Sequence, residues 1–272
     1  QSIFTAFESP ARQSLVPVLI GRRYLTEGMS LNWATFNAAF ITGPMIAGFL
    51  LVAGGAALTF TAATSTFIWM LIMLLRIRGE GDAPRGRFYL HGLMPDVISG
   101  ITYTLRHPLI PWVIGFHMIL GLLIRPYIEL MPGVASVVFE AGEQGMANLL
   151  ATSGAGALVV SVVMLMAGRE RWLMPILVWT QLISALSLAA FAATDVLWIA
   201  LVAVFFAGGF TTAAGIAAST LVQQSIDAAF RGRVVAISLA TNMGGPALGA
   251  FGIGWLAEGI GFQGALMAAA AL

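Results

Sequence analysis

The chain has 272 residues, of which 59% are hydrophobic and only 9% are charged, and its formal net charge is +1. Soluble domains carry about 25% charged residues, so this composition excludes a water-soluble globular protein, and the near-zero charge argues against a nucleic-acid-binding surface. The absence of cysteine excludes a disulfide framework, a thiolate metal site and a thiol nucleophile. We therefore expect an all-α integral membrane protein without a metal site or cofactor.

Hydrophobic runs long enough to cross a bilayer follow one another along the chain. About 20 apolar residues cross the hydrocarbon core. Complete runs are predicted at 32–53, 56–76, 109–127, 145–167, 172–193, 196–222 and 233–257, with partial runs at 1–7 and 262–272. Because the chain starts with Gln1 and ends inside an apolar run, we expect it to be part of a longer protein.

The arginines predict the orientation of these spans. There is no lysine, and 12 of the 13 basic residues fall in gaps on one side when the gaps are numbered alternately, leaving only Arg125 for the other side. Positive residues are enriched in cytoplasmic loops. We therefore place residues 8–31, 77–107, 168–171 and 223–232 in the cytoplasm of a multi-pass protein of the bacterial inner membrane.

A charged, glycine-rich interval at 76–92 divides the chain, and residues 95–108 (PDVISGITYTLRHP) follow it. Asp96 is the expected N-cap of a helix there, and His107–Pro108 is the expected end. Val97, Ile98, Ile101 and Leu105 would share one face. The segment is either an amphipathic helix on the membrane surface or a simple linker helix.

Two of the long runs contain glycine and proline where a soluble helix would not tolerate them. Gly43, Pro44 and Gly48 lie in one, and Gly245, Pro246 and Gly249 lie in the other, about 200 residues later. Glycine allows helices to approach closely in a bilayer. We expect two bent, tightly packed helices at equivalent places in two halves, with ordinary membrane-helix packing as the alternative.

Three stretches resemble one transporter family. GPMIAG at 43–48 is similar to the GPxxGG core of the fifth-helix motif of drug:proton antiporters in the major facilitator superfamily, with Ala47 in place of one glycine and Ala39 in place of another. Residues 6–20 and 231–261 resemble the fourth and eleventh helices of the bacterial exporter branch of transmembrane secretion effectors that includes the enterobactin exporter.

This resemblance implies the major facilitator fold, with the chain supplying helices 4–12 of twelve. Residues 1–76 would end the N-terminal half, 77–107 would form the linker, and 108–272 would form the C-terminal half. The implied function is proton-coupled efflux of a small drug-like or siderophore-like molecule by alternating access, in a monomer with the lipid bilayer, substrate and protons as partners. An importer of the same fold is the alternative, and a membrane-embedded enzyme or lipid scramblase is less favoured.

Ionisable residues within membrane spans are candidate functional residues. Arg125 and Glu129 are four residues apart and would be neighbours on a helix, either as an outer gate with a protonatable Glu129 or as a structural ion pair. His117 would either relay protons or bond to a neighbouring helix.

Glu8 and Arg12 would form either a cytoplasmic gate latch, as the resemblance implies, or an interfacial pair. The other polar side chains within or bordering the spans would bond across helices or line a cavity; they are Asn32, Asn37, Gln181, Gln223 and Asn242. The sequence contains none of the metalloprotease or phosphate-binding motifs of common enzymes, so no enzymatic activity is expected.

Overall fold

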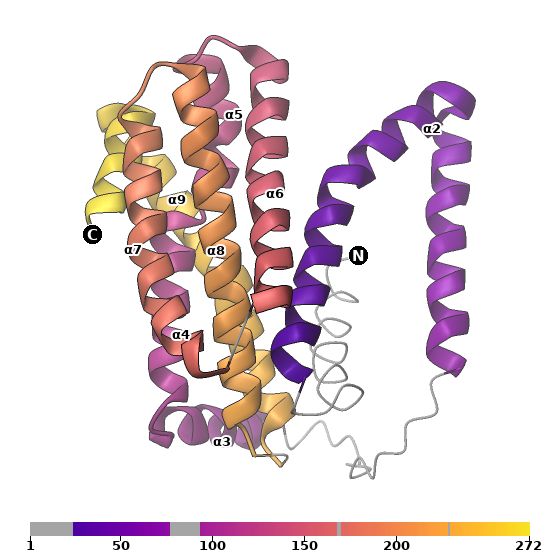
Figure 1. The fold of residues 1–272 in the computed structure, drawn as a ribbon, viewed down its shortest axis with the longest axis vertical. Helices are drawn as coiled ribbons and strands as arrows, with labels where there is room; N and C mark the ends of the chain where they lie inside the picture. The colour runs from indigo at the N-terminus through magenta and orange to yellow at the C-terminus, as the bar shows by residue number, and fades with distance from the viewer. Residues whose placement is uncertain (1–23, 77–92, 168–169, 228) are drawn as a thin grey trace.

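The computed structural model describes residues 24–76, 93–167, 170–227 and 229–272. Figure 1 shows α2 as a hairpin of two legs beside a bundle formed by the later helices, with α3 lying across one end. Regular structure in the described ranges is entirely helical, which confirms the predicted all-α class. The elements are α2 (Leu25–Arg76), α3 (Leu93–Arg106), α4 (Ile110–Ile119), η3 (Leu120–Ile124), α5 (Tyr127–Val137), α6 (Gly142–Ala167), η4 (Glu170–Trp172), α7 (Leu173–Ala192), α8 (Leu197–Ser225) and α9 (Arg231–Ala271).

The predicted spans agree closely with these helices. Six segments of the described chain are long and apolar enough to cross a membrane: Gly54–Met73, Ile110–Val137, Gln144–Met166, Leu173–Ala192, Leu197–Ser225 and Arg231–Ala271. The predicted run 32–53 is helical as well and lies in the first leg of α2. The chain is therefore a multi-pass membrane protein.

Two predicted boundaries are wrong. The span predicted at 109–127 continues to Val137, because Pro126 occupies the N-cap of α5, where its missing N–H costs little, and Pro132 is accommodated inside that helix. The loop predicted at 8–31 ends early, because α2 begins at Leu25. Leu25 and Met29 are buried, so this first turn is held by packing rather than by the membrane.

The chain leaves helical geometry at other glycines rather than at the Gly–Pro pairs. Inside α2, Gly54 and Gly55 leave helical geometry, with φ of 68° at Gly55, and inside α9 Gly261 does so with φ of 75°. Residues other than glycine rarely adopt such positive φ values. Both Gly43–Pro44 and Gly245–Pro246 lie within continuous helix, where bends were expected, and the departures from helical geometry lie in the turns between successive spans.

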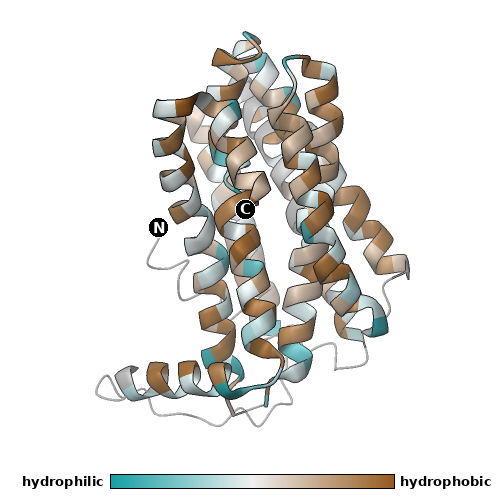
Figure 2. Ribbon diagram, turned by 90° about the vertical axis from the view of Figure 1, so that its left-hand side faces the viewer, coloured by the Kyte–Doolittle hydropathy of each residue, from teal (hydrophilic) through white to brown (hydrophobic). Residues whose placement is uncertain are grey.

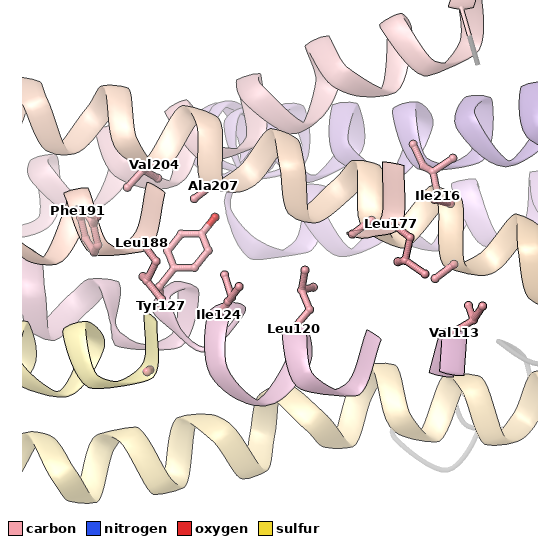
Figure 3. Close-up of a cluster of buried hydrophobic side chains, with 14 of the residues drawn as sticks. Val113, Leu120, Ile124, Tyr127, Leu177, Leu188, Phe191, Val204, Ala207 and Ile216 are labelled. Atoms are coloured by element: carbon pink, nitrogen blue, oxygen red, sulfur yellow. The ribbon is translucent and has the colours of Figure 1, made fainter. Parts of the chain in front are cut away.

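The core of the bundle lies between α4–α5, α7 and α8. Figure 3 shows Leu120, Ile124 and Tyr127 with Leu188, Phe191 and Val204 in one buried cluster. Hydrophobic residues also cover much of the outer surface, as the brown colour along the helices in Figure 2 shows. In the second leg of α2, the apolar segment Gly54–Met73 has no residue buried against the rest of the protein. This is expected where lipid rather than water surrounds the helices.

The helix α3 is attached to the turn between α8 and α9. The Tyr103 ring stacks on Phe230 with a centroid distance of 4.3 Å, and its hydroxyl donates to Asp227 over 3.0 Å. The apolar residues predicted to share a face are exposed: Val97, Ile98, Ile101 and Leu105. The helix ends at Arg106, as predicted, but it begins at Leu93. Asp96 is therefore an internal residue and not the N-cap, because Pro95 is tolerated in the first turn.

The arginine distribution predicts which end of the bundle is cytoplasmic. Reporters inserted at Glu170 and Ala229 are expected to be cytoplasmic, and reporters at Ala141 and Asp195 are expected to be external. Cysteine-accessibility labelling in intact cells measures this directly, since the chain has no native cysteine. A single reporter on the opposite face would show that the predicted alternation contains one span too many or too few.

Candidate functional site

A cavity of about 220 Å³ lies between the first leg of α2 and the bundle. Every long helix except α7 contributes to its wall. The lining residues are Trp33, His117, Arg125, Tyr127, Ile128, Glu129, Leu150, Ser153, Gly154, Ala157, Gly208, Thr211, Thr212 and Pro246. Three of them are the ionisable candidates that the sequence predicted: His117, Arg125 and Glu129. The cavity therefore brings the predicted residues together in one place.

A π-helical turn shapes the wall that carries Arg125. The N–H of Arg125 donates to the carbonyl of Leu120, five residues earlier, over 3.0 Å. Pro126 follows and cannot donate a backbone hydrogen bond, so the α-helical ladder restarts at α5. The helix is therefore broken at this point. Short π-helical turns occur often at functional sites.

Glycines bring α9 against this π-helical turn. A methyl group added at Gly249 would overlap the Leu122 carbonyl oxygen and lie 2.6 Å from Pro126. One turn earlier, Gly245 faces Gly121, and an added methyl group there would lie 3.4 Å from the Gly121 Cα. Gly245 and Gly249 therefore both lie against the π-helical turn, and the approach is tightest at Gly249. Only glycine permits the approach at Gly249.

This approach places Asn242 between two cavity residues. Arg125 Nη1 donates to Asn242 Oδ1 over 3.2 Å, and Asn242 Nδ2 lies 2.6 Å from His117 Nε2. Arginine has only donors, so Asn242 presents its oxygen to Arg125 and its amino group to His117. His117 Nε2 must then accept, and its proton is on Nδ1. The predicted alternative for His117, a bond to a neighbouring helix, is thereby realised.

The same chain of hydrogen bonds leaves a donor without a partner. His117 is only 7% exposed, and its Nδ1 has no hydrogen-bond partner among the described residues. Burying such a group unpaired costs about 1–3 kcal/mol. Because His117 lines the cavity, this N–H is a donor that a ligand or a water molecule in the cavity could satisfy.

Glu129 lies on the first turn of α5, exposed in the cavity wall. The guanidinium of Arg125 is bonded to Asn242 instead, and no Arg125–Glu129 ion pair forms within the described ranges. The break at Pro126 separates the two residues, which accounts for the difference from a continuous helix. No salt bridge of the kind expected for this pair is therefore formed among the described residues, and Glu129 is a carboxylate in the cavity wall.

Tyr127 and Ser153 are among the lining residues that were not identified from the sequence. The Tyr127 hydroxyl lies 2.8 Å from Ser153 Oγ, and this bond joins α5 to α6. Close packing fixes Ser153, because added methyl groups at Gly156 and Gly208 would overlap backbone atoms of Phe205 and Ser153. The signal was present in the small-residue stretch SGAGA at 153–157, whose role is helix packing.

The remaining predicted residues fall outside the cavity or outside the described structure. Gly43 is exposed, and a methyl group added there would meet no described atom within 4 Å, so the tight packing expected for it stays a prediction. Glu8 and Arg12, and the side chains of Pro44 and Gly48, lie outside the described residues. Gln181 donates to the carbonyl of Phe116 over 2.7 Å, and Gln223 contacts Met29, so both bond across helices as one alternative proposed.

Comparison with known proteins places the whole chain in one group. A family model described as transmembrane secretion effector matches residues 1–272. No match was found among curated proteins or among solved structures. The family match includes every helix that contributes to the cavity.

The glycine contacts predict different effects of the same added methyl group. Gly249→Ala should lower the melting temperature of the purified protein, because overpacking costs about 1–3 kcal/mol and the obstacle is a backbone carbonyl. Gly245→Ala should have little effect, since its methyl group would make an ordinary contact. Gly43→Ala should stabilise slightly, because alanine is favoured over glycine in helices by about 1 kcal/mol.

Thermal unfolding in one detergent checks these three variants together. Equal destabilisation at all three positions would contradict the assigned contact between α9 and the π-helical turn.

Proposed function

The chain belongs to the transmembrane secretion effector family of the major facilitator superfamily, and from this premise we propose that it is a secondary active transporter that exports a small amphipathic molecule. The observation that carries the proposal is the cavity, in which donors, a carboxylate and apolar side chains converge between α2 and the bundle. Residues 1–76 and 108–272 would belong to the two halves that move relative to each other.

The contacts of α2 support a model in which the cavity is closed at one end. Near the start of α2, Met29 is buried and accepts a hydrogen bond from Gln223 on α8. Trp33 packs on Gly215, where an added methyl group would lie 3.0 Å from the indole. Beyond this point the first leg of α2 diverges from α8 (Figure 1). We propose that these contacts form the closed cytoplasmic gate, with the side assigned by the arginines.

The wall of the cavity indicates the class of substrate. Arg125 and the His117 Nδ1–H supply donors, whereas Trp33, Ile128 and Leu150 supply apolar surface. Ligand pockets typically combine apolar walls with a few polar groups that fix orientation. We infer that the substrate has an apolar body and an anionic or hydrogen-bond-accepting group that contacts Arg125 and His117.

Proton coupling is assigned to Glu129. It is the one carboxylate among the described residues that line the cavity. Since the Arg125 guanidinium is held by Asn242, Glu129 is available to exchange a proton with whichever side the cavity faces. Binding of a proton and of substrate in the same small space makes each sensitive to the other, as antiport requires.

The function is tested by expressing the intact gene in a bacterial strain that lacks its own exporters. Toxic amphipathic compounds and siderophores are screened for accumulation. Lower accumulation of a compound, restored to the control level by a protonophore, would support proton-driven export. Higher accumulation would instead identify an importer, which is the alternative for the same fold.

Replacing Glu129 with glutamine separates binding from coupling. The amide keeps the shape of the side chain but cannot exchange a proton, so Glu129→Gln should retain substrate binding and lose uphill transport. The measurement is substrate flux into inverted vesicles with an imposed pH gradient, with flux expected to fall to the level of empty vesicles.

Glu140→Gln is the matched control, because Glu140 is an exposed residue in the turn before α6 and does not line the cavity. It should transport at the wild-type rate. Concentrative transport by Glu129→Gln at the wild-type rate would disprove the coupling role.

A further inference from the structure

Apart from the cavity, a groove lies on the outside of the bundle, at the corner between α3 and α4. Its volume is about 670 Å³, and it is lined by Leu105, Arg106, His107, Pro108, Pro111, Trp112, Gly115, Phe116 and Ile119. Trp112, Phe116 and Ile119 follow one another along the same side of α4 over about 10 Å. Trp112 is 66% exposed, and a methyl group added at Gly115 would meet nothing within 4 Å, so the groove is open.

Backbone hydrogen bonds fix the orientation of His107 at the mouth of this groove. The N–H groups of Leu109 and Ile110 donate to its Nδ1 over 3.2 and 3.3 Å. Nδ1 is therefore an acceptor, and in the neutral ring the proton must be on Nε2. No bond from Nε2 to another described residue occupies this donor.

Arg106 supplies a positive charge beside this donor. It is the last residue of α3, it is exposed, and its guanidinium makes no hydrogen bond or ion pair with the residues that the structure describes. Two other arginines at this end contact aromatic rings, since Arg171 lies 5.5 Å from the Trp172 ring and Arg233 lies 5.5 Å from the Phe230 ring. The nearby carboxylate of Asp227 accepts the Tyr103 hydroxyl.

The height of the groove relative to the membrane follows from α3. Its apolar residues Val97, Ile98, Ile101 and Leu105 are uncovered, and a helix of this kind lies at the boundary between headgroups and acyl chains. The mouth with Arg106 and His107 is then at headgroup level, and the wall of α4 runs into the hydrocarbon.

We propose that this corner binds an anionic phospholipid. The phosphate accepts hydrogen bonds from the guanidinium of Arg106 and the Nε2–H of His107, and one acyl chain lies along Trp112, Phe116 and Ile119. The apolar groove with donors at one end matches an amphiphile, and the cationic side chain matches an anionic headgroup. This site is separate from the cavity between α2 and the bundle.

The test compares two lipids that differ only in the headgroup. The intact protein in detergent is equilibrated with equal amounts of phosphatidylglycerol and phosphatidylcholine with identical acyl chains, and native mass spectrometry gives the ratio of bound lipids. We expect phosphatidylglycerol to be preferred, and Arg106→Gln to reduce the preference about fivefold. Arg106→Lys should retain most of it.

Two further variants test the imidazole and the chain-binding groove. His107→Asn should lower the preference without lowering the melting temperature, because the asparagine carbonyl can still accept from Leu109 and Ile110. Gly115→Leu should fill the open groove and prevent binding of phosphatidylglycerol while the protein stays folded. Arg171→Gln, in η4 just before α7, is the charge-matched control and should leave the preference unchanged.

Several outcomes would overturn the proposal. They are wild-type preference in Arg106→Gln, an equal loss in Arg171→Gln, and undiminished binding in Gly115→Leu.

Discussion

Contact between the backbone of α9 at Gly249 and the carbonyl of Leu122 determines how the cavity is built. Since a side chain at position 249 would overlap that carbonyl, the two segments approach only because the residue is glycine. The approach brings Asn242, two turns earlier on α9, to Arg125 and His117. The π-helical turn also contributes to the cavity, because it places Arg125 at the point where the α-helical hydrogen bonds are interrupted. Glycine, π-helical turn and hydrogen-bond chain thus form one unit.

Polar groups in this unit have few alternative partners. In the hydrocarbon region there is no water to satisfy a separated arginine or asparagine, so separation of α9 from α4 would leave both unpaired. Individual interhelical hydrogen bonds in membranes are worth only about 0.6 kcal/mol on average. These hydrogen bonds therefore act mainly on the specificity of the helix arrangement. The chain from Arg125 through Asn242 to His117 allows only one assignment of donors and acceptors, and it leaves the Nδ1–H of His117 for a ligand.

The sequence predicted the spans well because bilayer thickness sets their length. Runs of about 20 apolar residues and a one-sided arginine distribution are local properties, and no tertiary information is needed to find them. The cavity was predicted only in part. His117, Arg125 and Glu129 stood out as ionisable residues in apolar segments, but Asn242 is 117 residues from Arg125, and no local pattern singled it out among five polar residues.

Segments with the same local sequence pattern can have different structural surroundings. Gly43–Pro44 and Gly245–Pro246 look alike in sequence, yet only the second pair faces another helix among the described residues. Likewise, Arg125 and Glu129 have the spacing of a helical ion pair, but the helix is interrupted at Arg125 and Pro126, directly after the π-helical turn. A π-helical turn leaves no distinct hydrophobic period over so few residues, so periodicity could not reveal it.

The two faces of α4 show why such a helix is difficult to orient from its sequence. Ile110, Val113 and His117 are buried against the bundle, whereas Trp112 and Ile119 are exposed. In water these faces would differ in polarity. In a bilayer both can be apolar, because lipid and protein interior are similar solvents. The informative residues are then the exceptions: His117 marks the face toward the cavity, and Gly115, where the opposite face is hollow, marks the side toward the membrane.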